Sequence, residues 1–312
     1  MNNMEMQNHF GKIIEELQKQ KPVIHHITNY VTAEACADAA ICAGASPVMA
    51  DEPEEVEVIT AGSDALVLNL GTINYNKMIA MERSAMAAKK KGIPVVLDPV
   101  GVMSSALRLN FALKLLKGGY VNIVRGNYDE CRALADEKAA GHGVDGVLQA
   151  DEGEKLQAAK AVAAKFNCIA AVTGQVDYVS NGKQVLVLNG GNEMLKKITG
   201  AGCITTTLCA CCAAVTKDYM TAAALGVVIM GQAAELVAGF MEKKDGPGMF
   251  KTRLFDGIYH VTGKWNLINL KEFVYFYNLV LRHRISRQKS DRTLKFILMS
   301  TYIYHKFYYK FL

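Results

Sequence analysis

Short apolar runs alternate with longer segments of helical character through most of the chain, and this alternation constrains the fold more than any other feature. Continuous apolar runs predict strands at 23–29, 46–50, 65–69, 94–98, 122–125 and 168–173. Segments with helical spacing lie between them, at 32–43, 53–60, 75–91, 106–116, 128–138 and 155–166. Strands of this kind are typical of a parallel sheet that is covered on both faces. We therefore predict an α/β fold with a mostly parallel central sheet and helices on both of its faces.

Further elements are expected on either side of this region. An amphipathic helix is predicted over 4–19, before the first strand. A hairpin is predicted over 178–187, where Asn181-Gly182 favours a type I′ turn. Helices over 204–215 and 221–241 are apolar on nearly all sides, so we expect them to be buried. A last helix is expected to end near Tyr259.

Polar residues follow the ends of the predicted parallel strands. Because ligands of such sheets bind at the carboxyl ends of the strands, these residues are candidates for a ligand site. They lie at 28–29, 69–72, 98–101, 125–127 and 173–174.

A two-glycine turn precedes the first of the two apolar helices, in the sequence Ile198-Thr199-Gly200-Ala201-Gly202-Cys203. Glycine allows the backbone to approach a ligand closely, and unpaired N–H groups at a helix start favour an anion. We hypothesise that the helix start also lowers the pKa of Cys203. The alternative is that the turn and Cys203 only pack a strand against a helix.

The charge of the chain is spread unevenly. The chain has 35 Lys and Arg against 30 Asp and Glu, which gives a net charge of +5. The segment from Trp265 to the end has nine basic and two acidic residues, a net charge of +7. Residues 1–264 therefore carry a net charge of −2. The main body therefore lacks the charge of a nucleic-acid-binding protein. We expect a catalytic domain over 1–263 and a basic, aromatic extension over 264–312 with no role in the chemistry, although such a stretch could also contact an anionic membrane or a nucleic acid.

No stretch has the roughly 18 consecutive apolar residues of a membrane span, and the polar N-terminus lacks the apolar core of a signal peptide. We therefore expect no membrane partner. The eight cysteines do not form a pattern typical of disulfides, which favours a reducing cytoplasm. Cys209 and Cys212 have metal-site spacing but lie among apolar residues, so we predict that they are buried core residues. His25 and His26 end an early strand without a paired metal ligand, and we expect at least one of them to be structural, although His26 could line the mouth of a pocket.

Taken together, these motifs resemble the hydroxyethylthiazole kinase family of the ribokinase-like superfamily, over roughly residues 5–262. The matching segments are Thr28-Asn29-Tyr30-Val31, Gly44-Ala45-Ser46-Pro47-Val48-Met49-Ala50, Asn69-Leu70-Gly71-Thr72, Leu97-Asp98-Pro99-Val100-Gly101, Arg125-Gly126-Asn127 with Glu130, Val172-Thr173-Gly174, Thr199-Gly200-Ala201-Gly202-Cys203 and Gly246-Pro247-Gly248-Met249-Phe250. The resemblance implies that ATP phosphorylates 4-methyl-5-(2-hydroxyethyl)thiazole, in a homotrimer whose active sites lie between subunits.

The resemblance also implies roles for individual residues. Cys203 would be the general base, at the position where most of the superfamily is expected to have aspartate. Arg125 and Thr173 would bind ATP. Met49 and Gly200 would bind the thiazole, and Asp98 and Glu130 would hold Mg²⁺ through water. On the residues alone, Met49 could equally be core, Asp98 a helix cap and Glu130 a solvated helix residue.

Four other functions compete with this interpretation. A hydroxymethylpyrimidine kinase or an ATP-dependent hydrate dehydratase would share the fold, but cysteine at position 203 argues against both. A binding protein that has lost its catalytic base would keep the pocket. A Rossmann oxidoreductase is disfavoured because no G-x-G-x-x-G follows the first strands.

Overall fold

The computed structural model describes residues 3–139, 151–263 and 274–277, and its central feature is one sheet with the strand order β2-β1-β3-β4-β5-β6-β7-β8-β9. The first six strands in this order are parallel, and β7, β8 and β9 are antiparallel to their neighbours. The strands are β1 (Val23–Ile27), β2 (Ser46–Met49), β3 (Ala65–Asn69), β4 (Val95–Asp98), β5 (Ile123–Gly126), β6 (Ile169–Val172), β7 (Val176–Ser180), β8 (Val185–Asn189) and β9 (Val274–Tyr277).

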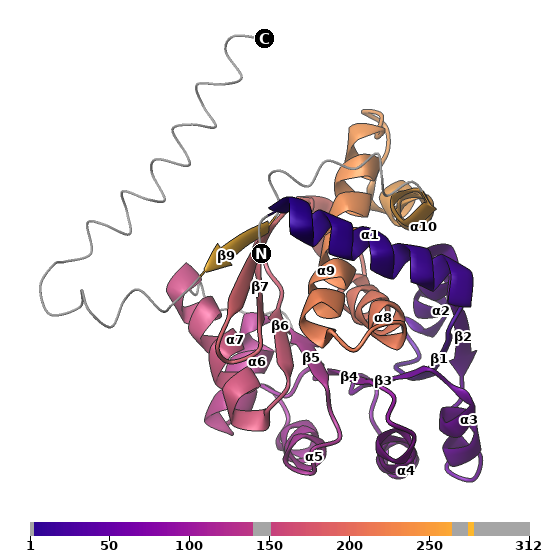
Figure 1. Ribbon diagram of the computed structural model, residues 1–312, viewed down its shortest axis with the longest axis vertical. Helices are drawn as coiled ribbons and strands as arrows, with labels where there is room; N and C mark the ends of the chain where they lie inside the picture. Colours follow the sequence, from indigo (N-terminus) through magenta and orange to yellow (C-terminus); the bar gives the residue numbers. More distant parts are fainter. Residues whose placement is uncertain (1–2, 140–150, 264–273, 278–312) are drawn as a thin grey trace, which may run out of the picture. The chain divides into compact units, whose positions relative to one another are not determined.

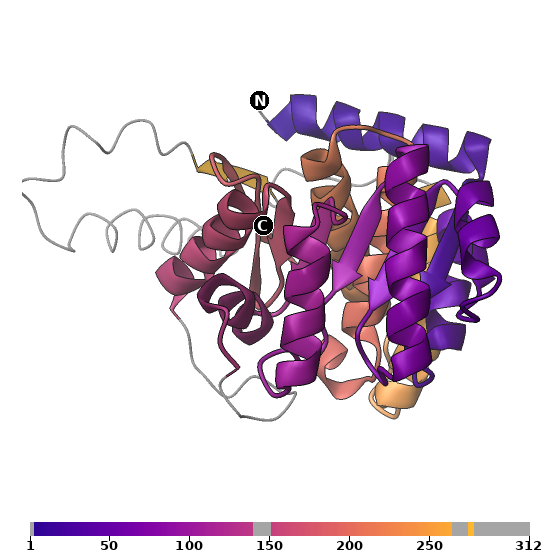
Figure 2. The ribbon, with the colours of Figure 1, turned by 90° about the horizontal axis from the view of Figure 1, so that it is seen from below.

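Helices cover both faces of this sheet (Figures 1 and 2). One face is covered by α8 (Ala201–Ala214) and α9 (Tyr219–Gly239), with α1 (Asn3–Gln20), α2 (Ala33–Ala43) and α10 (Pro247–Gly263) packed around them. The other face carries α3 (Val56–Gly62), α4 (Tyr75–Lys91), α5 (Ala106–Lys117), α6 (Tyr128–Asp136) and α7 (Glu152–Phe166). A short 3-10 helix, Glu193–Lys197, precedes α8. The predicted fold class is therefore confirmed.

Burial of the strands explains why the sheet forms. Every residue of β3 and of β4 is buried, as expected for parallel strands with helices on both faces. Two apolar cores result, one on each side of the sheet. Cys209 and Cys212 are fully buried on α8, which confirms their predicted place in the core.

The strand order changes direction at β1, because β2 lies on one side of β1 and β3 lies on the other. At such a switch point the loops that leave neighbouring strands separate, and they leave a crevice at the carboxyl ends of the strands. The loop after β1 and the end of β3 are therefore the expected ligand-binding edge.

One helix differs from the sequence-based expectation about membrane spans. Within the described residues, α9 is long and apolar enough to cross a membrane by length and composition, with a mean hydropathy of 1.6 over its best window. The sequence criterion, an unbroken apolar run, does not detect α9 because Gln232 and Glu235 interrupt the run. Its window is 67% buried inside the protein, as is usual for a core helix.

The predicted hairpin forms, but its turn is not of type I′. That turn needs positive φ at both central residues. Of the two predicted central residues, Asn181 and Gly182, only Gly182 has positive φ, and the Asn181 N–H donates to the Gln184 carbonyl. The side chain of Asn181 instead accepts hydrogen bonds from the backbone N–H groups of Lys183 and Gln184.

Strand β9 falls inside the segment that sequence analysis separates as an extension, and it pairs with β8 in antiparallel register. The rest of 264–312 lies outside the described residues, as does most of the glycine-rich stretch over 139–154. From Glu152 onwards that stretch is helical, because Asp151 and Glu154 form a capping box at the start of α7.

Candidate active site

Cys203 lies in the first turn of α8, at the switch point of the sheet. The helix begins at Ala201, earlier than expected, because Gly200 adopts φ 95° and caps it. The sulfur of Cys203 accepts hydrogen bonds from two side-chain amides, at 3.4 Å from Asn29 Nδ2 and 3.3 Å from Asn69 Nδ2. These amides come from the loop after β1 and from the end of β3.

Neighbouring groups fix the orientation of both amides. The Oδ1 of Asn29 accepts from the backbone N–H and the hydroxyl of Thr32, and the Oδ1 of Asn69 accepts from Asn29 Nδ2 and from the N–H of Gly71. Each NH₂ group must therefore face away from these donors. Both amides consequently present donors to the sulfur of Cys203.

Asp98, the last residue of β4, continues this network. Its Oδ2 accepts from Asn69 Nδ2 at 2.8 Å and from the Thr206 hydroxyl at 2.9 Å. Burial raises the pKa of the Asp98 carboxyl, while the charge of Arg125 and these two hydrogen bonds act in the opposite direction. Asp98 is 1% exposed and is not the helix cap that the sequence left open, because Ser105 caps the following helix.

Arg125 on β5 lies between the carboxyl groups and the glycine turn. It donates a hydrogen bond to the Thr173 hydroxyl, and a Cβ added at Gly202 would overlap its guanidinium. Burial opposes the charged form, but Asp98 and Glu130 raise the pKa of Arg125 above its usual value. In the part of the chain that the structure describes, the buried Nε of Arg125 has no hydrogen-bond partner.

Glu130 is held inside the protein and is not a solvated helix residue. It forms a capping box with Asn127 at the start of α6, and its other oxygen accepts from the N–H of Gly101 at 3.1 Å. Burial and the nearby Asp98 raise the pKa of Glu130 to about 7, against the effect of its backbone hydrogen bonds. The two carboxyl groups therefore share one buried, electrostatically linked region with Arg125.

The remaining candidate residues lie at the same edge of the sheet. Thr173 follows β6, and its N–H donates to the Gly126 carbonyl. Met49 ends the edge strand β2 beside His26, and it is 40% exposed, so it is not a core residue. Gly200 packs against Thr32, whose methyl carbon would lie 2.9 Å from a Cβ at that position.

The hypothesis of a lowered pKa for Cys203 is wrong. Burial and the nearby Asp98 raise the pKa of this thiol, and hydrogen bonds from Thr32 and Asn29 and the charge of Arg125 only reduce the shift. Burial is therefore the largest cause of the shift in the pKa of this thiol.

Both histidines are buried and hydrogen-bonded. His25 lies between the Thr60 hydroxyl and the Ala50 carbonyl, and His26 lies between the Ile24 carbonyl and the Thr207 hydroxyl. Burial lowers the pKa of both rings, that of His26 to about 4. The burial and hydrogen bonds of both rings agree with the prediction that at least one of them is structural, and His26, at 1% exposed, does not lie at the protein surface.

The chain is similar to known proteins over most of its length. It matches the model of the hydroxyethylthiazole kinase family over residues 14–264. It is 41% identical over 249 residues to the hydroxyethylthiazole kinase of Ruminiclostridium cellulolyticum, covering 79% of this chain and 90% of that protein. The chain belongs to the hydroxyethylthiazole kinase family. A member from Chloroflexus aggregans is 40% identical over 258 residues, with 83% and 91% covered.

Solved structures agree with this assignment to the hydroxyethylthiazole kinase family. The structure of hydroxyethylthiazole kinase protein from Pyrococcus horikoshii OT3 matches with a TM-score of 0.75 and 31% identity, over 86% of this chain and 98% of that one. The pyridoxal kinase from Staphylococcus aureus in complex with AMP-PCP matches with a TM-score of 0.54, over 69% of this chain and 88% of that one. At 14% identity, this second match shows a shared ribokinase-like fold only.

Sequence reasoning placed the edge of the sheet correctly but did not assign roles to several residues of this hydroxyethylthiazole kinase family member. Asn29 and Asn69 are polar strand ends within two family-matching segments and have no predicted role, although they contact Cys203 directly. Their position at the first and third strands, on either side of the switch point, was the signal available. Thr206, three residues after Cys203 on the same helix, had no such signal because its contact with Asp98 depends on the tertiary fold.

Proposed function

We propose that this protein transfers the γ-phosphoryl group of ATP to the hydroxyl of 4-methyl-5-(2-hydroxyethyl)thiazole, a salvage step toward thiamine. The family assignment and the names of relatives at 40–41% identity support this activity. The structural observation that carries it is the thiol of Cys203, which lies at the strand-order switch point with two oriented amide donors on its sulfur.

Cys203 would accept the proton of the substrate hydroxyl. The two amides favour the thiolate, because a charged acceptor strengthens their hydrogen bonds. The hydrogen bond from Asn29 thus offsets part of the effect of burial, which raises the pKa of the thiol. Phosphoryl transfer passes through a loose transition state, so alignment and charge stabilisation would supply most of the catalysis.

Arg125 and Thr173 would bind the phosphates of ATP. The hydrogen bond between them orients the guanidinium, and the unpaired buried Nε of Arg125 is a donor that a phosphate oxygen would satisfy. The backbone N–H groups at the start of α8 lie beside this guanidinium at Gly202, and their dipole favours added negative charge there. Met49 and Gly200 would contact the thiazole ring.

Asp98 and Glu130 fit a magnesium ion that retains most of its water. Among the described residues no group of three or more potential metal ligands is found, so a site with three or more such ligands has no support there. Mg²⁺, however, is usually held by one or two carboxylates together with substrate phosphates. The hydrogen bonds from Asn69 and Thr206 hold the Asp98 carboxyl in place on β4, so its position relative to such an ion would be fixed. When bound, the ion would neutralise charge on the transferred phosphoryl group.

The larger organisation follows from the same proposal. The protein would be a cytoplasmic homotrimer with active sites between subunits, in which Tyr30, Val31 and Met49 provide exposed apolar surface near the site. Residues 1–263 would form the kinase domain and 264–312 an extension outside the chemistry. No nucleic acid or membrane would be a partner.

A coupled assay of ATP consumption with Mg²⁺ and the thiazole alcohol tests this function. We expect turnover that depends on the alcohol, and little turnover when hydroxymethylpyrimidine replaces it. Binding of the alcohol by calorimetry without ATP consumption would instead identify a binding protein that has lost its catalysis. Preference for hydroxymethylpyrimidine would identify the neighbouring kinase activity.

A further inference from the structure

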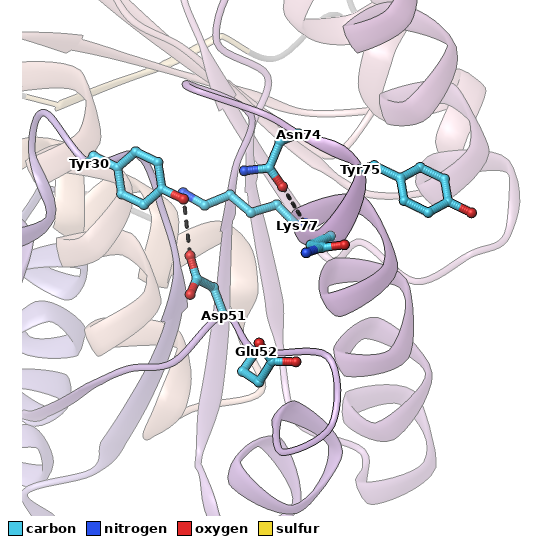
Figure 3. A pocket seen from close by; sticks show the side chains of 7 residues that line it. Tyr30, Asp51, Glu52, Asn74, Tyr75 and Lys77 are labelled. Atoms are coloured by element: carbon cyan, nitrogen blue, oxygen red, sulfur yellow. Dashed lines mark hydrogen bonds and ion pairs between the residues drawn. The ribbon is translucent and has the colours of Figure 1, made fainter.

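Lys77 is a fully buried basic residue next to the site, on the third residue of α4. It is 1% exposed, and its Nζ donates to the carbonyl oxygen of Thr28 at 2.6 Å. Figure 3 shows its side chain extending from the helix toward Tyr30 and Asp51. Lysine is almost never fully buried unless it is paired, so these contacts require an explanation.

The partners of Lys77 belong to two loops that carry candidate site residues. Thr28 and Tyr30 lie on either side of Asn29 in the loop after β1, and the Nζ of Lys77 lies 3.6 Å from the centre of the Tyr30 ring. Asp51 lies two residues after Met49, in the loop that leaves β2, and its Oδ2 is 3.6 Å from the same nitrogen. One ammonium group therefore connects the loop that contacts Cys203 with the loop that follows Met49.

The position of Lys77 itself is fixed by its helix. Asn74 caps α4 by accepting a hydrogen bond from the backbone N–H of Lys77 at 2.9 Å. The helix then packs on the sheet through Ala80 and Met81, both fully buried. The ammonium of Lys77 is thus anchored to a helix that is packed on the sheet, so it can hold the neighbouring loops in place. Lys77 lines a polar pocket of about 400 Å³ together with Tyr30 and Asp51 (Figure 3).

We propose that Lys77 is a positioning residue for the phosphoryl acceptor, which holds the loop of Asn29 and the loop after Met49 at a fixed separation. The effects that we expect on KM rest on the proposed function. Lys77 acts through the Thr28 carbonyl and Asp51 and does not contact Cys203. Loss of the ammonium would let the two loops separate, so it would weaken binding of the alcohol and move Asn29 away from the thiol.

Lys77→Met tests the proposal, because methionine keeps the length of the side chain and removes its charge and donors. We expect the KM for the thiazole alcohol to rise about tenfold or more, the loss expected when one charge-assisted hydrogen bond is removed, and the KM for ATP to stay within about twofold. Lys89→Met is the matched control, since Lys89 lies on the same helix, donates to the Gly118 carbonyl and lies over the Tyr120 ring. A uniform rise of both KM values would overturn the proposal.

A second variant covers the case in which Lys77→Met does not fold. Asp51 is 45% exposed at its side chain, so Asp51→Asn can be made without burying an unpaired group. It removes the ion pair and leaves the Thr28 hydrogen bond. We expect the same selective rise in KM for the alcohol, at about two- to fivefold, as for a partly exposed ion pair. An unchanged KM in folded Asp51→Asn and Lys77→Met would contradict a positioning role.

A readout without turnover separates this inference from the proposed function. The readout is the extent of iodoacetamide labelling of Cys203 as a function of pH, measured by peptide mapping. This labelling profile depends on the hydrogen bond from Asn29 to the thiol. Cys42 is the internal reference, because both thiols are half-buried. We expect labelling of Cys203 in Lys77→Met to move to higher pH than in Lys89→Met. If the parent enzyme does not phosphorylate the alcohol, the proposed function fails, and the labelling result still decides the role of Lys77. Identical labelling profiles would exclude the effect on Asn29.

Discussion

The amide nitrogen of Asn69 lies 3.3 Å from the sulfur of Cys203, so the last residue of β3 contacts the first turn of α8. The same nitrogen lies 2.8 Å from Asp98 Oδ2. One NH₂ group thus joins the candidate base to the candidate metal ligand, and each partner accepts one of its donors. A change at Asn69 should therefore affect stability and catalysis together.

Asn69→Leu removes, at nearly constant volume, the two hydrogen bonds that Asn69 donates to Asp98 and Cys203 and the two that it accepts from Asn29 and Gly71. We expect the free energy of unfolding to fall by about 1–3 kcal/mol, because buried Asp98 loses a donor and the N–H of Gly71 loses its acceptor, and we expect kcat to fall at least about tenfold. Urea denaturation and the coupled kinase assay measure the two effects. Asn110→Leu, at an exposed position of α5, serves as the control and should change neither quantity. A variant with parental stability would mean that the network contributes no energy.

Cys203→Ala tests the general base. If Cys203 accepts the hydroxyl proton, kcat should fall by about 10²- to 10⁴-fold while the KM for ATP changes little. Because burial and Asp98 raise the pKa of the thiol, the parent kcat should still rise with pH above neutrality, and this rise should be lost in the variant. Turnover within about threefold of the parent would show that the proton leaves by water or phosphate.

Most of the fold was predictable because each strand and helix is encoded locally. The fully buried strands β3 and β4 read as continuous apolar runs, and helices follow them at regular spacing. The edge that carries Asp98, Arg125 and Thr173 was predictable for a related reason, since parallel strands end at one side of a sheet. The family resemblance supplied the proposed roles, which burial and spacing alone left open.

Features that depend on contacts between distant segments were not predictable. The raised pKa of Cys203 results from burial and from Asp98, which is a neighbour only in the folded chain. Lys77 reads as a polar residue of an amphipathic helix, yet its ammonium is buried against Thr28. The start of α8 was also misplaced, because the cap depends on the left-handed conformation of Gly200 rather than on a capping side chain.

Gly202→Ala tests the close approach of Arg125 to the start of α8. The added methyl would overlap the guanidinium, so Arg125 must move away from its position beside Thr173. We expect the KM for ATP to rise by about tenfold, with a smaller effect on the alcohol. Gly239→Ala, on α9 with open space around the added Cβ, is the control and should behave as the parent. An unchanged KM for ATP would show that the position of Arg125 does not affect nucleotide binding.

Truncation after Gly263 tests the proposed extension. We expect turnover close to that of the full chain, because the candidate site residues all lie before this point. Since β9 pairs with β8, the truncated protein should expose a strand edge and aggregate more readily at high concentration. Light scattering and the kinase assay measure these effects. Loss of turnover in soluble, folded protein would place part of 264–312 in the chemistry.

His26 should make the protein less stable in acid. Burial lowers the pKa of His26 from about 6.5 to about 4. Between these two pH values, the unfolded chain binds a proton at His26 that the folded protein does not bind. The free energy of unfolding therefore decreases as the pH is lowered through this window. The contribution of His26 to this decrease is about 2 kcal/mol between pH 6.5 and pH 5.

His26→Asn isolates this contribution, because asparagine can donate to the Ile24 carbonyl but does not titrate. The variant loses the contact with Thr207 at every pH, so only the difference in slope between parent and variant is informative. Glu130, whose raised pKa acts in the opposite direction over much of this range, is common to both proteins and cancels. We expect urea denaturation at about pH 7.5 and about pH 5 to show a smaller acid loss for His26→Asn than for the parent and for His260→Asn, an exposed control on α10. Equal losses in all three proteins would mean that the buried ring does not control acid stability.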